Sequence, residues 1–182
     1  MSTMKLLFRL TLLSIFFVMT SCVKDLDLDQ AQEIVIPPSV ALDLIYFTID
    51  SSDFFSAGAS GPLVARDEVR LEFLDDDYIR DGLMRADYNF IFENSFTQTF
   101  NAKFTFLSEN NLVKYRVNFV IPAGSSASPA TIDYTEIINV DEIKAIRESI
   151  KMFVEIEMVP NGEAFEGELQ LKSKAFYKFE FK

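Results

Sequence analysis

Apolar and polar residues alternate along most of the chain from residue 39 onward. The segment TFNAKFTF (99–106) places Phe100, Phe104 and Phe106 on one side of an extended backbone, and VKYRVNFVI (113–121) repeats the pattern. A period of two, with aromatic and β-branched residues, is typical of half-buried antiparallel strands. We expect about nine strands, because the pattern recurs in LDLIYFTI (42–49), EVRLEF (68–73), DYNFIFE (87–93), TIDYTEII (131–138), MFVEIEM (152–158), GELQLKS (167–173) and AFYKFEF (175–181).

Turn-forming residues separate these segments. SENN (108–111) and PNG (160–162) have the composition of hairpin turns, because asparagine and glycine tolerate positive φ angles. SAGASGP (56–62) and PAGSSASPA (122–130) are typical of surface loops. SAGASG is rich in glycine, but it lacks the lysine and the strand–helix context of a phosphate-binding loop.

One segment departs from the alternation. DEIKAIRESI (141–150) has Ile143, Ile146 and Ile150 at helical spacing, and its acidic start favours a helix N-terminus. We expect a short helix here, packed on an open end of the sheets. Many short strands with regular turns favour an all-β fold, an antiparallel β-sandwich, over a barrel.

The first 22 residues have a different character. Lys5 and Arg9 precede an apolar run over residues 10–19, and small polar residues then lead to Cys22, the only cysteine. This is the layout of a secretory signal, and ten residues are too few to cross a bilayer core of about 30 Å. The alternatives are a buried helix and a single buried cysteine in a cytosolic domain.

The segment VMTSC (18–22) resembles a bacterial lipobox. This resemblance implies that Cys22 becomes the first mature residue and carries acyl chains, which attach the protein to the membrane. Two or more chains make such an anchor stable. VKDLDLDQ (23–30) is similar to the export signals of Bacteroidetes surface lipoproteins. We therefore expect a signal peptide over 1–21, a lipid-anchored tether over 22–38 and a β-sandwich domain over 39–182.

Charge narrows the classes of partner. The chain has a net charge of −11, and removal of the signal with Lys5 and Arg9 would leave −13. Such an acidic protein repels the phosphates of nucleic acids, so we expect no nucleic-acid partner.

The composition also argues against an enzyme. The chain contains no histidine, which removes the commonest general base, the usual nucleophile systems and nearly all zinc sites. Two glutamate pairs, Glu68 with Glu72 and Glu155 with Glu157, could in principle act as glycosidase acids. They are more simply explained as the solvent-facing side of strands. We expect no catalytic residue and no bound cofactor.

The densest group of acidic side chains lies in LDDDYIRD (74–81). Calcium prefers several oxygen ligands, which Asp75, Asp76, Asp77 and Asp81 could supply, although their spacing is not that of an EF-hand. The alternative is a solvated turn whose aspartates accept backbone hydrogen bonds.

Most phenylalanines fall on the inward side of the expected strands. Four of them, Phe54, Phe55, Phe96 and Phe165, fall in turns instead. They are the candidates for an exposed apolar patch, and the alternative is that they anchor the loops to the core.

The segment from Phe92 to Ile132 is similar to the sandwich domains of type 2 late-embryogenesis-abundant proteins. RLEFLDDDYIRD (70–81) and residues 149–174 make the chain resemble small uncharacterised flavobacterial lipoproteins. Neither resemblance implies a catalytic residue. We expect a non-enzymatic interaction or accessory module, held at the outer membrane through its lipid and bound to an envelope protein. The alternative is a module that binds calcium or a glycan at Asp75–Asp81.

Overall fold

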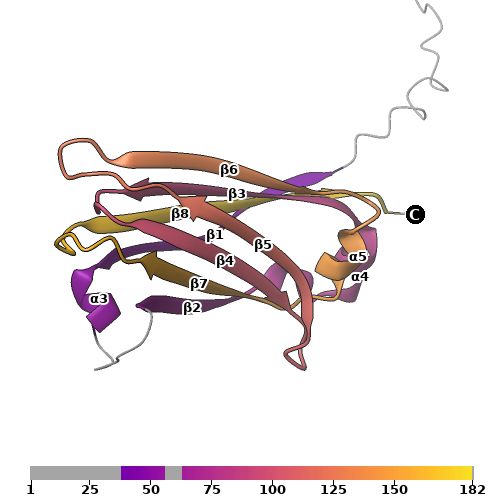
Figure 1. Cartoon of the computed structure of the whole chain (residues 1–182). Coiled ribbons are helices and arrows are strands. Elements are labelled where there is room, and N and C mark those ends of the chain that lie inside the picture. The colour runs from indigo at the N-terminus through magenta and orange to yellow at the C-terminus, as the bar shows by residue number, and fades with distance from the viewer. Residues whose placement is uncertain (1–37, 56–62, 182) are drawn as a thin grey trace, which may run out of the picture. The chain divides into compact units, whose positions relative to one another are not determined.

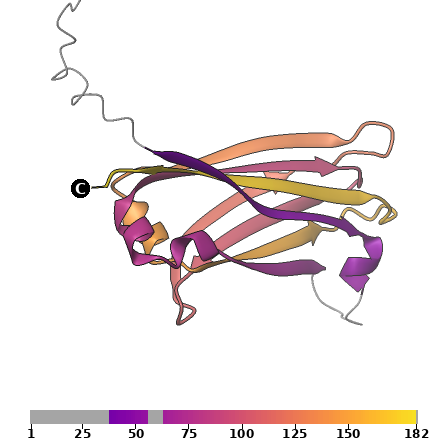
Figure 2. The same ribbon diagram turned by 180° about the vertical axis from the view of Figure 1, so that it is seen from behind.

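A computed structural model of the chain describes residues 38–55 and 63–181. In this part, eight strands form two antiparallel sheets that pack face to face, as Figures 1 and 2 show, so the expected β-sandwich is confirmed. The first sheet has the order β1 (Ser39–Asp50), β8 (Glu168–Phe179), β3 (Leu83–Asn94) and β6 (Ala130–Ile138). The second has the order β2 (Val64–Arg70), β7 (Lys151–Val159), β4 (Thr99–Leu107) and β5 (Val113–Ile121).

The strand pairing is nested. Strand β1 pairs with β8, β2 with β7, β3 with β6 and β4 with β5, all antiparallel. The chain therefore forms one long hairpin, whose tip is the turn between Ser108 and Leu112, rolled into two layers. Two further pairings, β3 with β8 and β4 with β7, complete the sheets. This arrangement defines a jelly roll.

Aromatic rings from facing strands fill the space between the sheets. The ring centroids of Phe90 and Phe104 are 4.1 Å apart, and those of Tyr88 and Phe106 are 4.8 Å apart. Each such side chain contributes about 1.5–3 kcal/mol by burial. The hydroxyls of Tyr88 and Tyr177 pair at 3.3 Å, so that two buried polar groups satisfy each other.

The segments GELQLKS and AFYKFEF form one strand, β8, which gives eight strands in place of about nine. The last inward position of GELQLKS is Ser173, whose hydroxyl accepts from the backbone N–H of Ile45 (3.1 Å) and donates to its carbonyl (3.0 Å). Ile45 lies at a β-bulge in β1. Ser173 thus forms hydrogen bonds with the backbone of β1, and it does not end strand β8.

Strand β2 begins and ends earlier than EVRLEF predicts. It ends at Arg70, and Leu71 donates its backbone N–H to the carbonyl of Ile150. The chain then turns through a 3-10 helix at Glu72–Leu74, which buries Leu74. Leu71 is buried as expected, but from a turn.

The expected helix is present as α5 (Ile143–Arg147), with Ile143 and Ile146 buried. Two other short helices, α3 (Ser51–Phe55) and α4 (Asp77–Gly82), were not predicted. Within residues 38–55 and 63–181, no helix is long and apolar enough to span a membrane.

The loops gather at two ends of the sandwich (Figure 1). The Pro38 end contains residues 71–82, 108–112 and 139–150, and there Phe179 donates its backbone N–H to the carbonyl of Pro38 at 3.0 Å. The far end contains residues 51–55, 95–98, 122–129 and 160–167.

Candidate functional site

The predicted attachment point lies outside the described part of the chain. Cys22, the signal peptide (1–21) and the tether up to residue 37 belong to the segment that the structure does not describe. Lipidation of Cys22 therefore stays a prediction.

Three carboxylates of the acidic loop form ion pairs or hydrogen bonds with nearby residues of the chain. Arg70 donates to Asp75 from Nε (3.0 Å) and Nη2 (2.9 Å), and Asp77 forms an ion pair with Arg80. Asp76 is the N-cap of α4 and accepts from the backbone N–H of Ile79 at 3.0 Å. For Asp76, this contact matches the alternative of a turn whose aspartates accept hydrogen bonds from the backbone.

Asp81, unlike Asp75, Asp76 and Asp77, lines a depression in the surface. This shallow depression of about 450 Å³ is also lined by Tyr78, Arg147 and Phe181. In the described ranges, no three acidic, cysteine or histidine side chains gather in a geometry that could hold a metal ion. Calcium binding at this loop stays a prediction.

Three phenylalanines, Phe54, Phe96 and Phe165, anchor the far-end loops to the core. Phe54 and Phe96 are buried, and Phe165 packs against the core from a half-buried position. The rings of Phe96 and Phe165 stack with centroids 4.6 Å apart, and Phe54 meets Phe165 edge-on at 5.2 Å. Phe54 and Phe96 thus do not form an exposed patch, and the alternative of loop anchoring is confirmed for them. The side chain of Phe55 lies outside the described part.

Buried amides connect the far-end loops to one another. The side chain of Asn94 donates to the carbonyls of Gln98 (2.9 Å) and Pro122 (2.8 Å), and its Oδ1 accepts from the N–H of Phe96 (2.9 Å). Residues 95–98 and the start of the 122–129 loop are therefore held by one side chain.

A second pair of amides extends this connection. Gln98 donates to Asn161 Oδ1 at 3.0 Å and to the carbonyl of Ala164 at 3.2 Å. Asn161 in turn donates to the carbonyl of Thr97 at 2.8 Å. Hydrogen bonds thus connect three of the four far-end loops named above. In the sequence, the only sign of this connection was the asparagine and glutamine within FENSFTQ (92–98).

The far end is uniformly acidic. In the described part, its loops and the strand residues that border them contain six acidic and no basic residues: Asp50, Asp53, Glu93, Glu163, Glu166 and Glu168. Asp50 lies directly opposite Glu168 in the β1–β8 ladder. A hydrogen bond from the Ser52 side chain lowers the pKa of Asp50 below its ordinary value. Like charges in such proximity favour a cationic partner.

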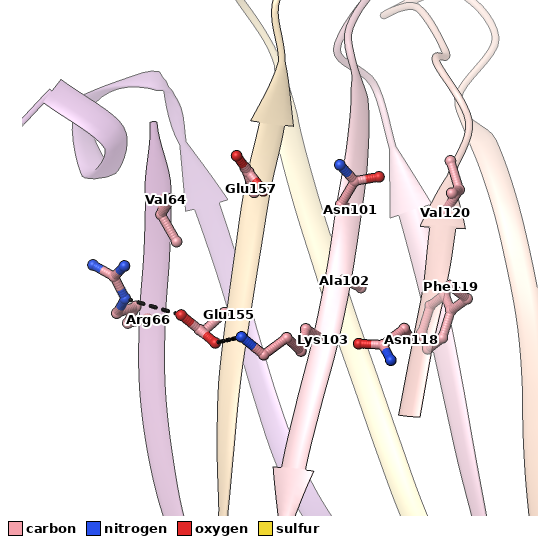
Figure 3. Close-up of a pocket in the computed structure, with 10 residues that line it drawn as sticks. All are labelled: Val64, Arg66, Asn101, Ala102, Lys103, Asn118, Phe119, Val120, Glu155 and Glu157. Carbon is pink, nitrogen blue, oxygen red and sulfur yellow. Dashed lines mark hydrogen bonds and ion pairs between the residues drawn. The ribbon is translucent and has the colours of Figure 1, made fainter. Parts of the chain in front are cut away.

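A second candidate lies on the outer face of the second sheet, where a depression of about 490 Å³ is open to solvent (Figure 3). Glu155 on β7 lies between Arg66 on β2 and Lys103 on β4 and forms ion pairs with both. Hydrogen bonding to Lys103, aided by Arg66, lowers the pKa of Glu155.

This geometry bears on the glutamate pair that sequence suggested. A glycosidase acid needs a raised pKa, and Glu155 has the opposite. Glu157 shares its face, in register with Val64 and Asn101. Glu68 accepts from Lys151 at 3.3 Å on the same sheet. The arrangement suits a charged sheet surface better than general acid catalysis.

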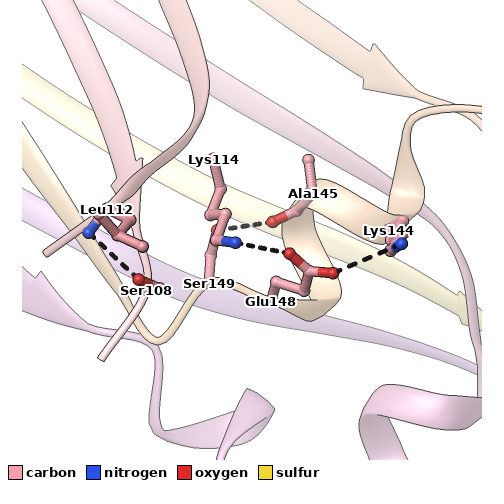
Figure 4. Close-up of polar contacts among 7 residues, drawn as sticks. All are labelled: Ser108, Leu112, Lys114, Lys144, Ala145, Glu148 and Ser149. Atoms are coloured by element: carbon pink, nitrogen blue, oxygen red, sulfur yellow. Dashed lines mark hydrogen bonds and ion pairs between the residues drawn. The ribbon is translucent and has the colours of Figure 1, made fainter. Parts of the chain in front are cut away.

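A third polar group lies where α5 meets β5 (Figure 4). Glu148 accepts from Lys114 at 2.6 Å and lies 3.9 Å from Lys144. The hydrogen bond from Lys114 lowers the pKa of Glu148. Ser149 donates to the carbonyl of Ala145 at 2.8 Å and ends the helix. These contacts fasten α5 to the second sheet and are structural in nature.

Comparison with known proteins finds similarity only to solved structures. No family model and no curated protein matches the chain. A predicted secreted protein from Parabacteroides distasonis is similar over 65% of this chain and 38% of its own, with 13% identity and a TM-score of 0.46. The VP2 subviral particle of infectious bursal disease virus matches 80% of this chain and 33% of its own, with 10% identity and a TM-score of 0.43.

A third similar structure is the enzymatically active domain of tailspike protein 4 of bacteriophage CBA120. It matches over 82% of this chain and 20% of its own, with 11% identity and a TM-score of 0.39. The chain thus spans well under half the length of each of these three structures. No functional residue is transferred from them.

Proposed function

We propose that the chain is a lipid-anchored protein of the bacterial outer membrane that acts as a non-enzymatic interaction module. It would hold an envelope protein partner, on either the outer or the periplasmic side. The observation that carries this proposal is the separation of the two ends of the sandwich. Pro38 is fixed at one end by the N–H of Phe179, and the interconnected acidic loops lie at the other.

The anchoring half of the proposal rests on Cys22. VMTS precedes this residue after an apolar run, and the chain has no second cysteine with which it could form an internal disulfide. Acylation would convert a free thiol into a membrane attachment. The far end lies at the opposite end of the sandwich from Pro38, the first described residue after the tether.

The binding half of the proposal rests on how the far end is built. Asn94, Gln98 and Asn161 hold its loops in place before any partner arrives, which lowers the entropy lost on binding. Its carboxylates would attract a basic surface and accelerate encounter with it. A partner with lysine or arginine at its contact surface fits these features best.

A second candidate function is a ligand-binding module at the acidic loop, Asp75–Asp81, that takes calcium or a glycan. The depression formed by Asp81, Tyr78 and Phe181 favours it, because the exposed Tyr78 ring lies beside a carboxylate. An exposed tyrosine and a carboxylate can together contact a sugar ring and its hydroxyls.

Site-specific photo-crosslinking in intact cells tests the leading proposal. A photoreactive residue at the exposed Ser126, in the far end, is expected to capture one envelope protein repeatedly. The matched position is the exposed Asn110 in the hairpin of the Pro38 end, from which the same product should be absent. Equal capture from both positions, or none from Ser126, would contradict the proposed orientation and role.

A further inference from the structure

The outer face of the first sheet exposes large apolar side chains. Tyr46 is 66% exposed, Ile137 47%, Phe176 42% and Ile91 37%. They come from four different strands and face away from the core, where antiparallel sheets normally carry polar residues. Exposed apolar groups that share one face indicate a binding surface.

The bulge in β1 turns Tyr46 to this face. Asp43 pairs with Lys174 and Tyr46 with Lys172, so that Leu44 and Ile45 together oppose the single residue Ser173. In a regular strand, Tyr46 would point to the side opposite Asp43, because it follows by three positions. The extra residue restores the outward direction, and the hydroxyl of Ser173 satisfies the bulged backbone.

Polar groups lie beside Tyr46 in two cross-strand rows that run across the sheet from β1. One cross-strand row contains Tyr46, Lys172, Ile91 and Asp133, and the next contains Asp43, Lys174, Asn89 and Thr135. Adjacent strands lie about 4.8 Å apart, so the groups on β8 and β3 are within reach of an oligosaccharide seated on the ring, whereas Asp133 and Thr135 on β6 are three strands away. A depression of about 410 Å³ covers Tyr46, Asn89, Ile91 and Lys172.

Several of these polar groups have capacity for further bonds. Asn89 donates to Asp133 at 2.6 Å and to Thr135 Oγ1 at 3.0 Å, which orients its own carbonyl oxygen as an acceptor. In the described part of the chain, the Lys172 side chain forms no ion pair, and the Tyr46 side chain forms no ring contact or hydrogen bond. Hydrogen-bond donors and acceptors, including the positively charged Lys172 and the negatively charged Asp43, thus lie near one exposed aromatic ring.

The spacing of the apolar groups favours a sugar over a protein as the occupant. Lys172 separates Tyr46 from Ile91, and Asp87 separates Phe176 from Ile137. A protein interface needs a continuous apolar centre, which these charges interrupt. A sugar ring instead presents an apolar C–H face to an aromatic ring and hydroxyls to the polar groups around it.

We propose that this face binds a neutral oligosaccharide, with one sugar stacked on Tyr46 and hydroxyls of the sugar chain bonded to Lys172 and Asn89. The balance of lysines and aspartates around the ring suits a neutral ligand. The site lies on another surface than both the far end and the acidic loop, and it does not depend on the proposed function.

Titration calorimetry on the purified full chain tests this assignment, with maltohexaose, cellohexaose and mannohexaose as probes. The wild-type protein is expected to bind at least one of them with a millimolar or tighter dissociation constant. Tyr46→Ala should weaken that binding about tenfold, and Tyr46→Phe should retain it because the stacked ring remains.

Two control variants separate this site from others. Leu112→Ala removes a comparably exposed apolar side chain of the Pro38 end (61%) and should leave the affinity unchanged. Lys144→Gln should also have no effect, whereas Lys172→Gln should weaken binding severalfold. The assignment is overturned if the wild-type protein binds none of the three sugars at millimolar concentration, or if Tyr46→Ala binds as tightly as the wild type. Loss of binding in Tyr78→Ala alone would place the ligand at the acidic loop.

Discussion

The carboxylate of Glu136 on β6 accepts a hydrogen bond of 2.6 Å from the hydroxyl of Tyr115 on β5. The two residues belong to different sheets, at an edge of the sandwich where β5 and β6 share no backbone ladder in the described structure. Tyr134 donates to the other oxygen of the same carboxylate. A single side chain, that of Glu136, therefore connects the two layers at this edge.

Replacing Tyr115 by phenylalanine should lower the free energy of unfolding by about 1–2 kcal/mol, because a hydrogen bond to a charged group is lost. Urea denaturation followed by circular dichroism measures the change. Tyr46→Phe is the matched control, since that exposed hydroxyl has no partner in the described part, and it should shift the value by less than about 0.5 kcal/mol. Equal effects of the two substitutions would mean that the bond to Glu136 contributes nothing.

Tyrosine ionisation should destabilise the fold at high pH. The hydrogen bond to Glu136 and partial burial raise the pKa of Tyr134 from 10.0 to about 12, and burial raises that of Tyr177 to about 12. Burial also raises the pKa values of Tyr88 and Tyr115. Below pH 10 these groups are neutral in both folded and unfolded chains, so their contribution to stability is fully present.

Between pH 10 and 12, the unfolded chain loses protons that the folded chain retains, and stability falls as the pH rises. The free energy of unfolding measured across this range should decrease steadily. The decrease should be shallower in Tyr134→Phe, which removes one of the shifted groups. A profile that stays level up to pH 12 would contradict the assigned shifts.

Removal of the Asp76 side chain should destabilise the protein by about 1 kcal/mol, since the N-cap of α4 is lost. Thermal melts of Asp76→Ala and of the wild type are compared with and without millimolar calcium. The cap accounts for the whole effect if calcium shifts neither melting temperature. A calcium-dependent rise in the wild type that disappears in Asp76→Ala would support the second candidate function instead. Asp81→Ala is a control within the same loop, because Asp81 caps no helix.

Two glycines at the far end should respond to alanine for different reasons. A methyl group on Gly124 would overlap the backbone carbonyl of Asn94, which cannot move without disturbing the amide connections, so a loss of about 2–3 kcal/mol is expected. Gly162 has open space around it but a φ of 84°, so its replacement should cost only about 1 kcal/mol. Denaturant unfolding of both variants checks this order, and a larger loss for Gly162→Ala would contradict it.

Strand positions could be predicted from sequence because burial in a sandwich imposes a period of two. Phe90, Phe104 and Phe106 fall inward as the alternation required. The pattern gave a wrong strand boundary where an inward side chain forms hydrogen bonds with the backbone of another strand. Ser173 resembles a break in an apolar face, yet it satisfies the bulge at Ile45. The nested strand order could not be predicted from sequence, because the alternation shows which face of a strand is buried and not which strand it pairs with.

The polar features of the candidate sites were predictable only in part. The cluster Asp75–Asp81 was visible as composition, but its local partners were not, because Arg70 reaches Asp75 only after the chain turns at Glu72–Leu74. The amides that interconnect the far end come from loops more than sixty residues apart, as between Gln98 and Asn161. Such contacts depend on the completed fold.

Whether Cys22 carries the membrane anchor tests the central claim most directly. Mass spectrometry of the protein extracted from membranes should find a chain that begins at Cys22 and carries acyl groups on that residue. Cys22→Ala should remain uncleaved and without acyl groups. A wild-type chain that keeps residues 1–21 or has an unmodified Cys22, or a Cys22→Ala variant that is processed and membrane-bound as before, would contradict the lipid-anchored account.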